Sequence, residues 1–390
     1  MSSWIVTRLS EVVRIIGGGT PKTSVADYWG GNIPWLSVKD FGGDRRYVND
    51  ADKKITRAGL ENSSTRLLDA GDLIISARGT VGEVAQLTRP MAFNQSCYGI
   101  SSVANKSDVN FLYYLLTLVV ENLKAMSHGS VFSTITRETF QQIEVNLPPL
   151  DEQRAIAATL GALDDKIESN RRALMLLREL GMARFEHVLS RGNERRLPLS
   201  DVSISIARGI APNYADHDPL APLVLNQRCV RDGRISLAPA RRMVDRQVAI
   251  TKKASSGDIL VNSTGTGTLG RIGRWHMGNI FVDGHVSVVR PNSEVVLPTV
   301  LAYALFSRET DIEDLATGST GQMELSPTNL GSLKVSLPSV DFSSELEDEL
   351  ITIESKSVQL EQEILRLERT RDALLPELLS GRIRAPEAVA

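Results

Sequence analysis

The stretch from Asp341 to Ser380 reads DFSSELEDELITIESKSVQLEQEILRLERTRDALLPELLS. Apolar or small residues recur in it, mostly four and three residues apart, at Leu346, Leu350, Ile353, Ser357, Leu360, Ile364, Leu367, Leu374 and Leu378. This spacing is typical of a coiled-coil helix, whose apolar stripe is narrower than that of a globular helix. A helix of about 40 residues is roughly 60 Å long. Such a helix, with one narrow apolar stripe, requires a partner helix.

An earlier segment of the same chain carries the same pattern, 190 residues upstream (341 − 151 = 190). The matching positions are Ile156, Leu160, Leu163, Ile167, Asn170, Leu174, Leu177, Gly181, Arg184 and Val188. The lead-ins also match, because VNLPPLD ends at Asp151 and VSLPSVD ends at Asp341. We therefore predict two long antiparallel helices that pair through Ile156, Leu160, Leu163, Ile167, Asn170, Leu174, Leu350, Ile353, Leu360, Ile364, Leu367 and Leu374.

The ends of both helices carry recognisable signals. Asp151 and Asp341 suit helix N-caps, and Ser344 with Glu347 offers a capping box. Gly192 and Gly381 follow the predicted C-terminal ends, where glycine is common. Pro376 is expected to kink the second helix or to end its regular part.

Asn170 and the pair Gly181/Arg371 depart from the apolar pattern. A polar residue at a paired position costs stability but penalises slipped pairings, so Asn170 is a candidate register device. An exposed asparagine near the middle of the helix is an equally good interpretation. Gly181 and the equivalent Arg371 indicate that this end of the helix pair is not a simple coiled coil.

The repeat extends over the whole chain at an offset of about 186 to 190 residues. Matching segments are Gly71–Ser76 with Gly257–Asn262, and Gly79–Gly82 with Gly267–Gly270; Tyr114 matches Tyr303. Each unit is thus a mixed α/β globular block followed by a long helix, and the chain is a tandem duplication. A pseudo-two-fold molecule follows, with the helices acting as a spacer between the blocks.

The predicted boundaries follow from the repeat. The fold class is mixed α/β (α+β). We expect a first globular block over 1–150, a first helix over 151–192, a second block over 193–340, a second helix over 341–384 and a tail over 385–390.

Composition limits the class of protein. The chain has 390 residues with a net charge of −3, but 1–150 carries 15 basic and 14 acidic residues and 191–340 carries 17 and 14. The acidity lies mainly in the last 50 residues, with 6 basic and 12 acidic. Cys97 and Cys229 support neither a disulfide framework nor a cysteine metal site. No secretion signal is visible, and the apolar run Phe111–Val120 predicts a buried helix, so we expect a cytoplasmic protein without a membrane span.

Catalytic signatures are missing. Gly265–Gly270 fits the GxGxxG pattern, but no amphipathic helix start follows it, so a strand–turn–strand is the better interpretation. There is no P-loop, no HExxH, no amino-methyltransferase motif and no supported nucleophile–base pair. His128 is expected in a solvated loop and His285 in the core. We expect no enzyme activity, no metal site and no cofactor.

Local charge points to an anionic partner instead. Asn226–Lys253 carries eight basic residues against Asp232 and Asp245. Such a run is more often a solvated face, and it becomes an anion site only with supporting architecture. The glycine turns with Arg78 and Thr80, or Thr266 and Thr268, could approach a phosphate backbone closely.

The whole chain resembles the specificity subunit of type I restriction–modification systems. The resemblance rests on LPPLDEQRAI (147–156), on the Gly-Asp-led strands at 71–75 and 257–261, on GSTGQ (318–322) and on the helix ends LSRG (189–192) and LSGR (379–382). The start of the second helix departs, since Asp341 is followed by Phe-Ser-Ser where the family often has Glu-Gln.

The resemblance implies that each block is a target recognition domain and that the helices are conserved spacers. Each domain would read one half of an asymmetric bipartite site in double-stranded DNA, mostly from the major groove. The half-site centres would lie roughly 34–36 Å apart if both domains bind one face of the duplex. Two modification subunits and, in the larger complex, motor-nuclease restriction subunits are the implied partners. S-adenosylmethionine, ATP and Mg are then expected on those partner subunits only.

The candidate DNA contacts are basic or hydroxyl-bearing residues in the two blocks: Arg45, Arg46, Lys53, Arg78, Arg228, Arg231, Arg234, Arg241, Arg242 and Thr266. Replacing Arg241 and Arg242 by alanine is expected to weaken binding and flatten its salt dependence if both touch phosphates. Two rival classes remain at this stage, a DNA methyltransferase-like enzyme and a standalone coiled-coil scaffold.

Overall fold

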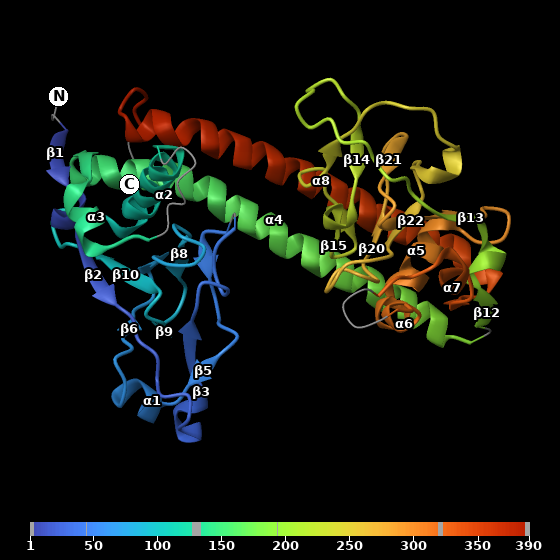
Figure 1. The fold of residues 1–390 in the computed structure, drawn as a ribbon, viewed down its shortest axis with the longest axis horizontal. Coiled ribbons are helices and arrows are strands. Elements are labelled where there is room, and N and C mark those ends of the chain that lie inside the picture. The colour runs from blue at the N-terminus through green and yellow to red at the C-terminus, as the bar shows by residue number, and fades with distance from the viewer. Residues whose placement is uncertain (1–3, 44, 127–133, 193, 319–322, 387–390) are drawn as a thin grey trace. The chain divides into compact units, whose positions relative to one another are not determined.

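The computed structural model describes residues 4–43, 45–126, 134–192, 194–318 and 323–386. The chain forms two compact units. Unit 1 is Met1–Arg171 with Glu361–Ala390, and unit 2 is Arg172–Leu360. The long helices are α4 (Leu150–Ser190) and α8 (Val340–Leu379), so each unit contains one globular block and one half of each long helix (Figure 1).

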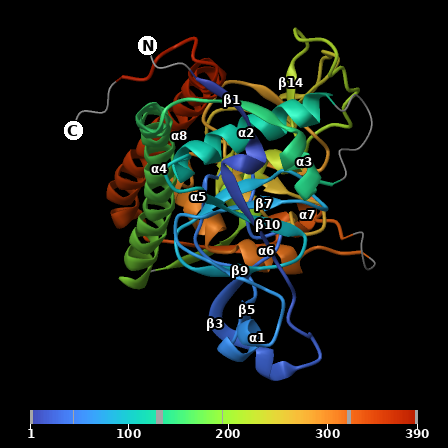
Figure 2. The ribbon, with the colours of Figure 1, turned by 90° about the vertical axis from the view of Figure 1, so that its left-hand side faces the viewer.

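Unit 1 contains a five-stranded sheet, a four-stranded sheet and a two-stranded pair. The five-stranded sheet has the order β2 (Val13–Gly17), β10 (Cys97–Ser102), β7 (Leu73–Ser76), β8 (Val84–Leu87) and β4 (Tyr47–Val48). The four-stranded sheet has the order β5 (Lys54–Ile55), β3 (Trp29–Leu36), β9 (Met91–Phe93) and β6 (Leu67–Leu68), and β1 (Ile5–Arg8) pairs with β11 (Glu144–Leu147). The helices are α1 (Arg57–Glu61), α2 (Val109–Met126) and α3 (Arg137–Gln142). Figure 2 shows α1, β3 and β5 at the end of unit 1 farthest from α4.

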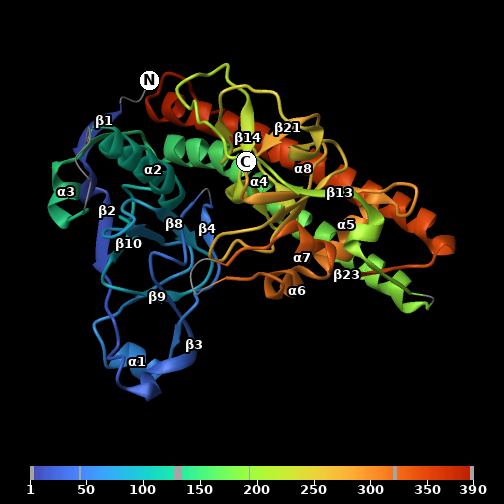
Figure 3. The same cartoon turned by 45° about the vertical axis from the view of Figure 1, so that its right-hand side comes forward.

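Unit 2 repeats this strand order. One sheet runs β13 (Ser203–Arg208), β22 (Val286–Pro291), β19 (Ile259–Asn262) and β20 (Ile272–Arg274). The other runs β17 (Arg241–Arg242), β14 (Leu223–Leu225), β21 (Ile280–Val282) and β18 (Lys253–Ala254), and two small pairs add β12 (Arg195–Pro198) with β23 (Lys334–Leu337) and β15 (Val230–Arg231) with β16 (Arg234–Ile235). The helices are α5 (Pro298–Phe306), α6 (Glu309–Asp314) and α7 (Pro327–Gly331), and Figure 3 shows α5 and α7 grouped beside β23.

The matching order confirms the mixed α/β class and supports the duplication. The parallel pair β3–β9 of unit 1 has its counterpart in the parallel pair β14–β21 of unit 2. The two central strands, β7 and β19, are buried along their whole length. Strands covered on both faces consist of continuous rather than alternating apolar runs, which explains LIIS and ILVN at these positions.

The apolar run at Phe111–Val120 forms part of α2, as predicted from its composition. Phe111 and Tyr114 are among the largest fully buried side chains. Within the described ranges, no helix has the length and apolar character needed to cross a bilayer.

Three of the predicted end signals of the long helices act differently from the prediction. α4 begins at Leu150, so Asp151 lies in its first turn and is not the N-cap. α8 begins at Val340, which places Ser344 inside the helix, and the helix continues through Pro376 to Leu379. The side chain of Asp341 lies outside the described residues.

Two end signals act as expected. Gly192 and Gly381 follow the helices with φ of 100° and 71°, a region that favours glycine. The backbone N–H of Gly381 donates to the carbonyl of Leu378 at 3.2 Å.

Glu347 has a role that the capping-box interpretation missed. Its carboxylate accepts hydrogen bonds from the backbone N–H of Thr299 (2.9 Å) and of Val300 (2.8 Å), and from the Thr299 hydroxyl (2.6 Å). These donors are the first N–H groups of α5, which have no partner inside their own helix. A residue of α8 therefore caps a helix of the globular block. Gln153 of α4 plays a similar part in unit 1, since its Oε1 accepts from the Asp108 N–H at 2.9 Å, just before α2.

The long helices are antiparallel within each unit. In unit 1 the first half of α4 meets the second half of α8 through Arg171–Glu368 (2.8 Å) and Arg371–Asp164 (2.9 Å). In unit 2 the second half of α4 meets the first half of α8 through Arg184–Glu349 (2.6 Å). All twelve residues predicted to pair the helices are buried or half-buried.

The apolar stripes of the long helices pack against the globular blocks as well as against each other. Ile156 and Leu160 lie in one core with Leu375, Leu378 and the apolar residues of the first block. Leu346 and Leu350 likewise lie in one core with Phe185 and the residues of the second block. Each block therefore completes the core that the helix pair begins.

Asn170 is buried, with 2% of its surface exposed, which rules out the exposed alternative. Its Nδ2 has no hydrogen-bond partner among the described residues. A buried donor without a partner costs about 1–3 kcal/mol. This cost is consistent with a residue that is retained because it fixes the register of the two paired helices, and not because it stabilises them.

Glu354 of α8 is a buried carboxyl in unit 2. It pairs with Arg274 of β20, while His276 Nε2 lies 4.0 Å away and Glu347 stands two turns earlier on α8. Burial raises the pKa of Glu354 to about 7 despite the attraction of Arg274. Burial and Arg274 lower the pKa of His276 to about 4, so the histidine is neutral near pH 7.

Replacing Asn170 by leucine is expected to stabilise the chain, because the substitution removes the unpaired amide from the core. We expect the midpoint of thermal unfolding to rise by about 3 °C, equivalent to about 1 kcal/mol. Differential scanning calorimetry measures it. Ser169→Leu, at the neighbouring exposed position, is the matched control and is expected to leave the midpoint nearly unchanged. A lower midpoint for Asn170→Leu would show that Asn170 has a partner in solution.

Glu354 predicts a pH dependence of stability. Its folded pKa of about 7 exceeds the ordinary 4.5, so between these values the folded state binds more protons than the unfolded state. The stabilisation is therefore complete below pH 4.5 and is lost as the pH rises through about 7, by roughly 3 kcal/mol at most. Urea unfolding of Glu354→Gln and of the unchanged chain at several pH values measures the difference. Parallel curves for the two proteins would contradict the assignment.

Candidate nucleic-acid interface

The cations of unit 1 divide into exposed and buried groups. Arg45, Lys53 and Arg78 are exposed, whereas Arg46 is 7% exposed and lies among Gln86, Asn110 and Tyr114. The prediction that Arg46 contacts DNA is therefore wrong, because its guanidinium is enclosed, just before β4, by hydrogen bonds to those three residues. A run of charges in the sequence does not reveal which of two neighbouring arginines is buried.

Arg45 lies on a segment fixed at both ends. Phe41 is buried before it and Arg46 after it. Gly42 and Gly43 have φ of 110° and 66°, and the Gly43 N–H donates to Glu83 Oε2 at 2.9 Å. The exposed Arg45 is thus followed directly by the buried Arg46.

Lys53 lies before β5, and its ammonium stands 5.9 Å from the centroid of Trp29. Trp29 packs edge-on against Trp35, with 5.2 Å between ring centroids. A cation beside an aromatic ring is arranged as in proteins that hold a nucleic-acid backbone and stack on bases, although the same pair also stabilises a surface by itself.

Arg78 precedes a glycine turn between β7 and β8. Gly79 and Gly82 have φ of 82° and 84°, and the Ser76 hydroxyl accepts from the Glu83 N–H at 2.8 Å. A Cβ at Gly79 would meet nothing within 4 Å, so the turn faces open space. Its backbone can therefore come close to a ligand.

Thr266 lies on the equivalent turn of unit 2, between β19 and β20. Gly265, Gly267 and Gly270 have φ of 101°, 72° and 82°. β20 begins at Ile272, so a strand and not a helix follows the GxGxxG pattern. The strand–turn–strand interpretation is confirmed, and a dinucleotide site at this turn is excluded.

The turn lies beside another candidate. A Cβ at Gly265 would stand 3.1 Å from Gln227 Nε2, and the exposed Arg228 follows Gln227. The structure therefore brings Thr266 and Arg228 into one neighbourhood, although they are 38 positions apart (266 − 228 = 38).

Arg231 and Arg234 face one another across the two-residue hairpin β15–β16. Asp232 and Gly233, with φ of 53° and 75°, form its turn. Both arginines are exposed, and like charges directly opposite each other destabilise a hairpin. Asp232 already offsets part of that repulsion, since its Oδ2 lies 3.5 Å from Arg231 Nε.

Arg241 and Arg242 are held by internal contacts. Arg241 lies 3.4 Å over the Tyr214 ring and donates to Asp216 Oδ2 at 2.5 Å. The guanidinium lowers the pKa of Asp216. Arg242 Nη1 donates to the Ala221 carbonyl at 2.5 Å. These arginines are therefore less available to phosphates than the basic run suggested.

Tyr214 is a surface group that the sequence analysis did not single out, and His285 is a surface group that it placed in the core. The Tyr214 hydroxyl donates to Asp283 Oδ2 at 2.8 Å, and His285 Nδ1 lies 2.7 Å from Thr264 Oγ1. The side chain of His285 is 58% exposed, so the prediction of a core histidine was wrong. His285 lies in the turn before β22, and only the sheet register reveals that position. His128, expected in a solvated loop, lies outside the described residues.

Neither cysteine nor any metal cluster adds to this interface in the described part of the chain. Cys97 and Cys229 are buried free thiols, and burial raises the pKa of the Cys97 thiol to about 12. No group of three or more potential metal ligands occurs among the described residues.

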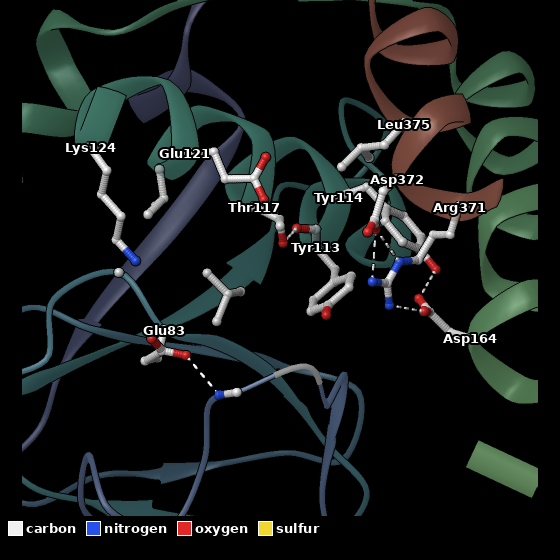
Figure 4. A pocket seen from close by; sticks show the side chains of 14 residues that line it. Glu83, Tyr113, Tyr114, Thr117, Glu121, Lys124, Asp164, Arg371, Asp372 and Leu375 are labelled. Carbon is white, nitrogen blue, oxygen red and sulfur yellow. Dashed lines mark hydrogen bonds and ion pairs between the residues drawn. The ribbon is translucent and has the colours of Figure 1, made fainter. Parts of the chain in front are cut away.

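A cavity of about 280 Å³ lies in unit 1 between the globular block and both long helices. Figure 4 shows Glu83, Glu121 and Lys124 on one side of it and Asp164, Arg371 and Asp372 on the other. Its walls carry both signs of charge, so they define no single ligand class.

Comparison with known proteins finds one family model and several relatives that resemble this chain. Residues 1–176 match the family model described as type I restriction modification DNA specificity domain. The MjaIX type I specificity subunit of Methanocaldococcus jannaschii is 30% identical over 189 residues, which are 47% of this chain and 43% of that subunit. The matched segment thus spans less than half of that relative. The EcoBI specificity subunit of Escherichia coli is 23% identical over 427 aligned residues, with 98% of this chain and 87% of the relative covered.

A solved structure agrees in fold. The S subunit of a type I restriction–modification system from M. genitalium aligns with a TM-score of 0.57 and 17% identity, over 96% of both chains. Together with the sequence matches, this confirms the resemblance to type I specificity subunits.

Proposed function

We propose that this chain, whose residues 1–176 belong to the specificity-domain family of type I restriction–modification systems, is the DNA-recognition subunit of such a complex. Each globular block would read one half of an asymmetric bipartite site in double-stranded DNA. The long helices would set the spacing between the halves and bind two modification subunits, with restriction subunits in the larger complex. The chain itself would be non-catalytic, with S-adenosylmethionine, ATP and Mg on the partners.

The observation that carries this proposal is the duplication. Both units build the same order of four strands in each of two sheets, with β4 added at one edge in unit 1, and each closes its core with halves of both long helices. Equivalent glycine turns begin with an open glycine in both units, since a Cβ at Gly79 or at Gly267 would meet nothing within 4 Å. The side chains around those turns differ, with Arg78 at one and Thr266 beside Arg228 at the other. Two similar frames with different contact residues suit two different half-sites.

The charge distribution supports the same partner. The globular blocks 1–150 and 191–340 are slightly basic, although the chain has a net charge of −3. Their exposed arginines stand on turns and hairpins, and arginine contacts to phosphates fix the register of a protein on a duplex. A methyltransferase-like enzyme or a scaffold without DNA would need neither feature.

Two double substitutions of equal charge test DNA binding. Each phosphate contact contributes about 0.9 to the slope of log K against log salt. Replacing Arg45 and Arg78 by alanine is expected to lower that slope by about 2, because both are exposed. Replacing Arg241 and Arg242 is expected to lower it less, because Asp216 and the Ala221 carbonyl already hold them. Fluorescence anisotropy with a duplex of mixed sequence, in the assembled complex, measures both slopes.

The outcomes separate the alternatives. Equal reductions would show that Arg241 and Arg242 leave their internal partners on binding, as the sequence alone suggests. Unchanged slopes in both variants would contradict a DNA interface at these turns. S-adenosylmethionine binding by the isolated chain would favour the enzyme class instead.

A further inference from the structure

Arg46 is a buried cation that the proposed DNA contacts do not use. Among the described residues it has no carboxylate partner within salt-bridge distance. Its Nε and Nη2 donate to Gln86 Oε1 at 3.0 and 2.8 Å, and Nη2 also donates to Asn110 Oδ1 at 2.8 Å. The rings of Tyr47, Tyr113 and Tyr114 surround it at 5.0 to 5.2 Å. A buried guanidinium with neutral neighbours needs a counter-charge nearby.

The counter-charge comes through one hydroxyl. Arg46 Nη1 donates to the Tyr114 hydroxyl at 3.0 Å, and that hydroxyl donates to Asp164 Oδ2 of α4 at 2.5 Å. Asp164 also accepts from Arg371 Nη1 of α8 at 2.9 Å. The series Arg46–Tyr114–Asp164–Arg371, which we call the tyrosine bridge, thus joins the globular block to both long helices within unit 1.

The tyrosine bridge is enclosed. Tyr114 and Asp164 are 1% and 4% exposed. Burial raises the pKa of Tyr114, so its hydroxyl keeps the proton that it donates to Asp164. The cavity of about 280 Å³ lies against Tyr114, Asp164 and Arg371 (Figure 4), so apolar packing alone does not fill this junction. Directed hydrogen bonds therefore define the geometry there more than shape does.

Arg46 also ends the segment that exposes Arg45. The guanidinium anchors this segment on one side, and the bond from the Gly43 N–H to Glu83 anchors it on the other. A shift of Arg46 would move Arg45 against the sheet and the helices. Phosphate and base contacts depend on such placement.

We propose that the tyrosine bridge is a positioning device for recognition: it holds the Arg45 segment in register with the helix pair, and so sets how strictly the first block reads its half-site. This inference rests on the proposed function. Tyr114 and Arg46 are positioning residues in it, and neither touches DNA.

Unit 2 provides a matched control. Tyr303 is the repeat equivalent of Tyr114, but its hydroxyl makes no hydrogen bond to any described residue. Gly181 stands where the repeat has Arg371, and a Cβ there would lie 2.5 Å from the Tyr303 ring. Arg274 reaches Glu354, the equivalent of Asp164, directly. Close packing and a direct ion pair thus replace the hydroxyl link in unit 2.

The test uses the complete modification complex in its host. Tyr114→Phe removes one hydroxyl and keeps the ring, and Tyr303→Phe makes the same change where no hydrogen bond is lost. Long-read sequencing then maps methylated adenines for each variant. We expect Tyr114→Phe to raise methylation about tenfold at sites with one altered base pair, in one half of the motif only. Arg45→Ala should alter the same half, and Tyr303→Phe should leave the motif unchanged.

Other outcomes overturn the inference. A uniform loss of methylation with an unchanged motif would make the tyrosine bridge a purely structural feature. An equal rise in methylation at altered sites for Tyr114→Phe and Tyr303→Phe would show that the tyrosine bridge has no special role in recognition. If the complex with Tyr114→Phe does not assemble, Arg46→Lys replaces it in the test. This substitution keeps the positive charge but loses the forked hydrogen-bonding geometry of the guanidinium, and it too is expected to relax one half of the motif only. A wild-type complex whose methylation shows no motif dependent on this chain would overturn the proposed function itself.

Discussion

The structure depends on the burial of two narrow apolar stripes, one on each long helix. Neither helix can bury its stripe alone, and within each unit half of one helix packs against half of the other. The globular block then completes the same core, as Ile156 and Leu160 do with the first block and Leu346 and Leu350 with the second. The globular block and the helix pair therefore share one hydrophobic core within each unit, so a block cannot reorient without disturbing helix packing.

Polar contacts between the long helices and the blocks fix the orientation of these packed elements. Glu347 caps α5 and Gln153 binds the chain ahead of α2, so each long helix satisfies backbone donors of a block. The two copies of the repeat differ at the equivalent positions Gly181 and Arg371, and this difference changes how the helices contact each block. Gly181 permits tight packing of Tyr303, whereas Arg371 leaves room for an ion pair and a cavity beside Tyr114. The two equivalent junctions thus differ: unit 2 uses close packing and a direct ion pair, and unit 1 uses hydrogen bonds through Tyr114.

The architecture was predictable because its signals are periodic. The four–three spacing and the constant offset identify both helices and the duplication, and all twelve predicted pairing residues are buried or half-buried. The candidate site was less predictable, because charge alone does not report orientation. Arg46 proved buried, Arg241 and Arg242 proved internally held, and His285 proved exposed. The burial or exposure of each of these side chains depends on strand register or on a partner distant in sequence, such as Gln86 for Arg46 or Asp216 for Arg241. Asp151 and Ser344 failed as caps because each helix begins one residue or more before them.

The domain boundaries and the spacing role of the helices remain proposals that connect this fold to a bipartite DNA site. Their most direct test is a map of methylated adenines in the host genome with and without the gene for this chain. The account predicts one asymmetric motif, two unlike halves at a fixed spacing, that disappears when the gene is deleted. A methylation pattern that is the same in both strains would contradict it.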